Sequence, residues 1–97
     1  MTLFNSQPCG YAQQSLTVAA NLSGVSTAVG KGANYAMLVP ESNNLRYRDD
    51  GTDPTTTVGV PLLAGQTLMY DGDLANLRVV SQSGTCSLNI AYYRARR

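Results

Sequence analysis

Apolar side chains recur at every second position along most of this chain, and this spacing constrains the fold more than any other feature. The clearest run lies near the carboxyl end and consists of Cys86, Leu88, Ile90 and Tyr92. A period of two places one set of side chains on one face of a β-strand, whereas a helix needs a period near 3.6. No segment keeps the helical period for long, so we predict an all-β fold.

Turn signals separate the alternating runs about every ten residues, which is typical of small β folds. The strands that we expect cover residues 15–20, 25–29, 34–39, 45–48, 56–62, 68–70, 77–79 and 86–92. The best helical candidate is a single turn around residues 73–77. Seven or eight short strands with this spacing predict a small antiparallel β-sandwich or a jelly-roll-like barrel.

The phase of the alternation predicts which side chains are buried. Leu45 and Tyr47 should face inward, while residues 34–39 are apolar on both faces and predict a central or covered strand. One further run should face inward through Thr56, Val58, Val60 and Leu62.

Residues 1–14 fall outside the alternating pattern, and Pro8 and Gly10 interrupt them. We therefore predict an extended N-terminal arm over residues 1–14 and a single domain over residues 15–97. An extended segment needs partners for its backbone groups, so we expect the arm to lie on a neighbouring subunit. Its anchors there would be Leu3, Phe4 and Tyr11.

Composition narrows the function. The 97 residues include no His and no Trp, which excludes catalytic triads, His general bases and His-ligated zinc. Charged residues make up 13% of the chain, about half the usual share. We therefore expect part of its surface to be covered by another protein surface. The net charge of +1 does not favour nucleic acid as a partner. No apolar run approaches the ~20 residues that span a membrane.

The aspartates lie in turn sequences, where they hydrogen bond to nearby backbone. We therefore expect no catalytic carboxylate pair, no cofactor and no enzyme activity. A calcium ion is the alternative for four of these residues if their turns lie at the same end of the fold. They are Asp49, Asp53, Asp71 and Asp73.

Cys9 and Cys86 are too far apart in sequence for a CxxC redox or zinc motif. The first residues lack the basic and apolar regions of a secretion signal, so we expect reduced thiols made in a cytoplasm. A disulfide between the two cysteines stays open.

Arg46 and Arg48 alternate with Leu45 and Tyr47, so both arginines should project away from the core. Two readings carry equal weight. The pair either forms a solvated strand face or points at a partner subunit.

The stretch from Leu45 to Leu62, continuing through Ala64-Gly65 to the segment Tyr70–Leu74, resembles small virion proteins of tailed bacteriophages. Such proteins are similar in length and end in a strand like Leu88–Tyr93, so the resemblance covers residues 34–93. It marks strands and turns rather than a chemical site. It implies a structural role in the particle, as a capsid decoration (cement) protein, a head-fibre base or a minor tail component.

From this resemblance we expect a capsid decoration protein that is made in the bacterial host cytoplasm and binds the major capsid protein on the virion surface. A charge-poor surface favours symmetric self-association, and a homotrimer suits three-fold positions on a shell, with a dimer as the second form. The alternative function is a tail or head-fibre component that binds a receptor or carbohydrate.

Overall fold

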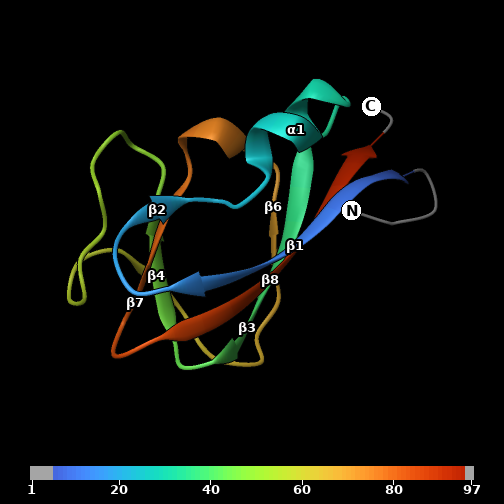
Figure 1. Cartoon of the computed structure of the whole chain (residues 1–97). Helices are drawn as coiled ribbons and strands as arrows, with labels where there is room; N and C mark the ends of the chain where they lie inside the picture. Colours follow the sequence, from blue (N-terminus) through green and yellow to red (C-terminus); the bar gives the residue numbers. More distant parts are fainter. Residues whose placement is uncertain (1–5, 96–97) are drawn as a thin grey trace.

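The computed structural model describes residues 6–95. In chain order its elements are β1 (Ser6–Leu16), β2 (Ala20–Asn21), α1 (Val25–Gly30), β3 (Tyr35–Ser42), β4 (Leu45–Arg48), β5 (Val60–Leu62), β6 (Leu68–Tyr70), η2 (Leu74–Asn76), β7 (Arg78–Ser81) and β8 (Cys86–Ala95). The strands of this range form two antiparallel four-stranded sheets (Figure 1). Sheet A has the order β1-β8-β3-β6, and sheet B has the order β2-β7-β4-β5.

The expected small antiparallel all-β fold is therefore confirmed, while the choice between a sandwich and a barrel stays a prediction. The 3-10 turn η2 confirms the single helical turn expected around residues 73–77.

In β8 every second side chain faces the core, as expected from the sequence. Its four alternating apolar residues are almost completely buried, with exposed fractions of 0 or 1%. On β3, which lies between β8 and β6, Ala36 and Leu38 are equally buried, so the prediction of a central strand is confirmed. These side chains share one core with Leu45 and Val79 of sheet B.

The helix α1 and the segment before it close the core at one end of the sheets (Figure 1). Leu22 and Ala28 are both buried in the core cluster. The Tyr92 hydroxyl reaches the same segment and donates a 2.6 Å hydrogen bond to the carbonyl of Ser23. Burial raises the pKa of Tyr92 to about 12, because the ionised phenolate loses its hydration there.

The predicted arm is wrong for residues 6–14. These residues belong to β1, which pairs with β8 from Ser6 to Leu16 and so crosses the expected domain boundary. The pairing with β8 satisfies the backbone groups on one side of β1, whereas we expected a neighbouring subunit to supply these partners. A bulge at Cys9, between Pro8 and Gly10, shifts the register and hides the alternation in the sequence. Leu3 and Phe4 lie outside the described residues.

Residues 25–29 were expected to form a strand and instead form the helix α1. The run Val25-Thr27-Val29 has the period of a strand, but Val25, Ala28 and Val29 also have helical spacing. Ala28 is the buried residue of this helix, whereas Val29 is 42% exposed. Gly24, with a φ of 75°, allows the backbone to turn into the helix.

Two other expected strands are shorter than predicted. The run over residues 15–20 breaks after Leu16, and Val18 in the connection to β2 is 72% exposed. The run over residues 56–62 keeps only β5, in which Leu62 is buried as expected. Thr56 is exposed, and Val58 and Val60 are half exposed, so the predicted inward position of these three residues is wrong. Tyr47 is partly buried and packs against the core.

Candidate functional site

The aspartate turns do not assemble a metal centre in the part of the chain that the structure describes. No three His, Cys, Asp or Glu side chains lie together there as metal ligands. Asp49 accepts a 2.6 Å hydrogen bond from the Tyr70 hydroxyl, and Asp53 pairs with Arg78. Burial, and then the Asp49 carboxylate, raise the pKa of Tyr70 well above its usual range. Asp71 and Asp73 line a cavity of about 400 Å³ beside Leu74.

Cys9 and Cys86 are separate free thiols, and both are buried. The Cys9 thiol contacts the carbonyl of Lys31 at 3.8 Å, and the Cys86 thiol contacts that of Asn43 at 3.6 Å. Burial raises the pKa of the Cys86 thiol, which disfavours the reactive thiolate.

Arg46 and Arg48 lie on the outer side of sheet B and bind their own chain. The Arg46 guanidinium donates to the carbonyls of Thr56 and Gly59, at 3.1 and 2.8 Å. Arg48 forms two hydrogen bonds with Asp50, at 3.0 and 2.5 Å. These hydrogen bonds raise the pKa of Arg48 and lower that of Asp50. The loop of residues 49–59 thus occupies both arginines.

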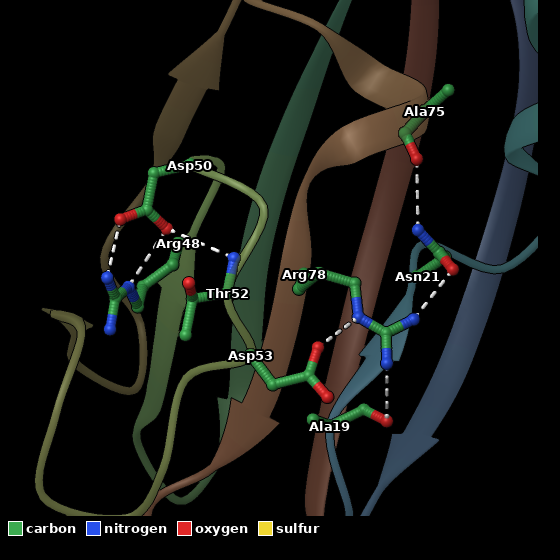
Figure 2. Close-up of polar contacts among 8 residues, drawn as sticks. All are labelled: Ala19, Asn21, Arg48, Asp50, Thr52, Asp53, Ala75 and Arg78. Atoms are coloured by element: carbon green, nitrogen blue, oxygen red, sulfur yellow. Dashed lines mark hydrogen bonds and ion pairs between the residues drawn. The ribbon is translucent and has the colours of Figure 1, made fainter.

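Arg78 of β7 extends this network, and sequence reasoning missed it (Figure 2). Its guanidinium donates to Asp53 Oδ1 and to Asn21 Oδ1, both at 2.7 Å. Asn21 in turn donates to the carbonyl of Ala75 at 3.0 Å. One arginine therefore links the 49–59 loop to β2 and, through Asn21, to η2. No local pattern pairs Arg78 with Asp53, because 25 positions separate them.

The outward side of sheet A has a different chemistry. The strand register aligns one row across it that consists of Tyr11, Ala91, Met37 and Met69. Neighbouring rows align Gln13, Asn89 and Val39 on one side, and Pro8, Tyr93 and Tyr35 on the other. These ten residues, called the outer face of sheet A below, include no charged side chain.

Several side chains of the outer face of sheet A reach solvent. Tyr11 is 66% exposed and Met69 is 39% exposed, whereas Tyr35 is buried and stacks on Tyr93 with 5.3 Å between ring centroids. The Tyr11 hydroxyl donates to Asn89 Oδ1 at 2.7 Å, and Asn89 donates to Glu41 at 3.3 Å. Glu41, near the end of β3, thus places a carboxylate at the rim of an otherwise neutral face.

The five candidate contact residues therefore separate in the structure. Tyr11 lies on the outer face of sheet A, Arg46 and Arg48 lie on sheet B, and Leu3 and Phe4 are outside the described residues. The sequence did contain one sign of the outer face of sheet A, because residues 34–39 are apolar on both faces of the strand. The structure buries one of these faces in the core and leaves Met37 and Val39, on the other, only partly covered.

No protein-family model, curated protein or solved structure matches this chain. Within residues 6–95, no helix is long and apolar enough to cross a membrane. The fold and the candidate site define the class on their own: a small antiparallel β protein with a neutral, partly exposed sheet face.

Proposed function

We propose that this protein is a non-enzymatic structural protein of a tailed-bacteriophage virion that binds the major capsid protein and decorates the capsid. The protein is made in the host cytoplasm and ends on the capsid surface. The resemblance of residues 34–93 to small virion proteins suggests the particle. The outer face of sheet A is the observation that carries the binding role.

A neutral sheet face suits permanent contact with another protein. Burying apolar surface contributes about 25 cal/mol per Å², and no charge on this face has to lose its hydration. Met37, Met69 and Tyr93 supply the apolar area, while Gln13 and Asn89 supply amide groups for hydrogen bonds. Capsid shells offer such contacts in many symmetric copies, so a single kind of interface can bind many subunits of one small protein.

The charge distribution supports a protein partner rather than nucleic acid. Binding to phosphates needs free cations grouped on one surface. Four of the seven basic residues instead donate to groups of their own chain, namely Arg46, Arg48, Arg78 and Arg94.

Copy number in purified particles tests the proposal. Phage particles purified from a bacterial host that carries the gene should contain hundreds of copies of this protein per capsid, as measured by quantitative mass spectrometry. Met69→Glu places a carboxylate on the outer face of sheet A and should reduce occupancy at least about tenfold. Thr67→Glu, on the exposed loop before β6, is the matched control and should decorate normally. Absence from particles, or equal occupancy of both variants, would contradict the proposal.

A tail or head-fibre protein that binds carbohydrate is the second candidate. It is favoured by the contact between exposed Tyr11 and Asn89, with Glu41 beyond, because sugar sites combine an aromatic ring with amide and carboxylate groups. In that case the particle should hold only a handful of copies. Host-surface oligosaccharides on an array should bind the native protein and not Tyr11→Ala.

A further inference from the structure

Among the described residues the two sheets have four edge strands, and β1 alone of these is long. In the described part of the chain β1 has 11 residues, whereas the other edge strands β5 and β6 have 3 each and β2 has 2. Very short edge strands are a common protection against pairing with another chain, because they offer few free backbone groups. The β1 edge lacks that protection.

The two halves of β1 differ in how well they are protected. In the first half, Pro8 has no backbone N–H and the bulge at Cys9 interrupts the ladder. From Gly10 to Leu16 the register with β8 is regular. No other described strand borders this stretch, and the rest of the chain meets it through side chains such as Gln14, which binds the backbone of Asn21 and Ser23.

We propose that residues 10–16 of β1 pair with the same residues of a second copy, antiparallel and around a two-fold axis at Gln13. An antiparallel edge is self-complementary, since rotation by half a turn presents the same free N–H and C=O groups to themselves. Gln13 is the midpoint of the regular stretch. It would face Gln13 of the other copy, and Tyr11 would face Ser15.

A second copy fits this edge better than a strand of another protein does. β1 contains no charged residue, so no like charges meet when it faces itself. Glutamine opposite glutamine joins two amides, each with a donor and an acceptor. A three-fold axis cannot place one edge against itself, so the edge favours the dimer over the trimer expected from the sequence.

The pairing has a consequence for the shape of the assembly. Joining two β1 edges makes one continuous sheet in the order β6-β3-β8-β1-β1-β8-β3-β6. The two outer faces of sheet A then lie side by side and form a neutral surface of twice the width. The dimer does not depend on the virion role proposed above, and it can be tested in solution without particles.

The first experiment measures the mass and the register of the assembly. Analytical ultracentrifugation of the intact chain should give the mass of two chains. Gln13→Cys should form a disulfide-linked dimer under mild oxidation, because residues that face each other directly have Cβ atoms close enough for the bond. The control Thr67→Cys carries an exposed cysteine away from β1 and should stay uncrosslinked. A monomer or trimer mass, or equal crosslinking of both variants, would overturn the proposal.

The second experiment exchanges charge at the two-fold axis. Gln13→Glu and Gln13→Lys each place like charges opposite one another, so each should weaken the dimer about fivefold. An equal mixture of the two variants should recover the native affinity as a heterodimer. Gln13 is exposed on the sheet, so both variants should melt near the native temperature. Two weakened variants that do not recover on mixing would contradict the axis at Gln13.

Discussion

The outer sides of the two sheets are built from opposite kinds of residue. Sheet B carries Arg46, Arg48 and Arg78, and each of them binds a group of its own chain. The outer face of sheet A has no charged side chain and makes few polar contacts of its own. These three arginines thus hold a long loop in place, while the neutral face is the surface for which we propose association. Substitutions on the outer side of sheet B should therefore alter stability, and substitutions on the outer face of sheet A should mainly alter binding.

The largest stability effect should come from Gly59, where the 49–59 loop reaches sheet B. Gly59 has a φ of 138°, and an added Cβ would lie 3.1 Å from the Cβ atoms of both Arg46 and Pro54. Gly59→Ala should therefore lower the free energy of unfolding by about 2–3 kcal/mol. Gly65→Ala is the matched control, because Gly65 also has a positive φ but open space around it. It should cost about 1 kcal/mol in urea unfolding. Equal losses of unfolding free energy for the two variants would show that close packing of Gly59 against Arg46 does not add to the cost.

A smaller loss should follow removal of the Arg78 guanidinium. Arg78→Met keeps much of the side-chain length but removes the hydrogen bonds to Asp53 and Asn21. We expect a loss of about 1.5 kcal/mol, reduced by the partial exposure of the pair. Arg48→Met is the control and should cost less, because Arg48 binds only the nearby Asp50 in these contacts. Thermal unfolding of both variants measures the difference, and a larger loss for Arg48→Met would reverse the order of the two arginines.

The strands that could be predicted from sequence are those whose inward residues are large and regularly spaced. Cys86 to Tyr92 show this best, since both the strand and its buried face were expected and are present. The strand β1 was missed because its bulge at Cys9 breaks the period of two. The helix α1 was missed because six residues fit both periods, and only packing of Ala28 into the core decides between them.

The candidate site could be predicted only in part for a similar reason. Tyr11 was selected as a contact residue, but its place on the outer face depends on pairing with β8, across almost the whole chain. Arg46 was correctly placed outside the core, but its carbonyl partners come from a loop whose path the sequence does not specify. Register and loop path are set by long-range packing, which alternation along one strand does not reveal.

The smallest effect should come from the outer face of sheet A. Tyr11→Phe removes only the hydroxyl that donates to Asn89, and the ring is 66% exposed. Water can replace the lost donor at Asn89 Oδ1, so we expect a loss below about 0.5 kcal/mol in urea unfolding. Arg78→Met, measured in parallel, supplies the contrasting loss on sheet B. If Tyr11→Phe destabilised the protein as much, the hydrogen bonds of the outer face would help to hold the fold, and the division of roles between the two sheets would be wrong. A small loss of unfolding free energy would show that the Tyr11 hydroxyl is not needed for the fold. This part of the outer face of sheet A could then bind another protein without any cost in stability.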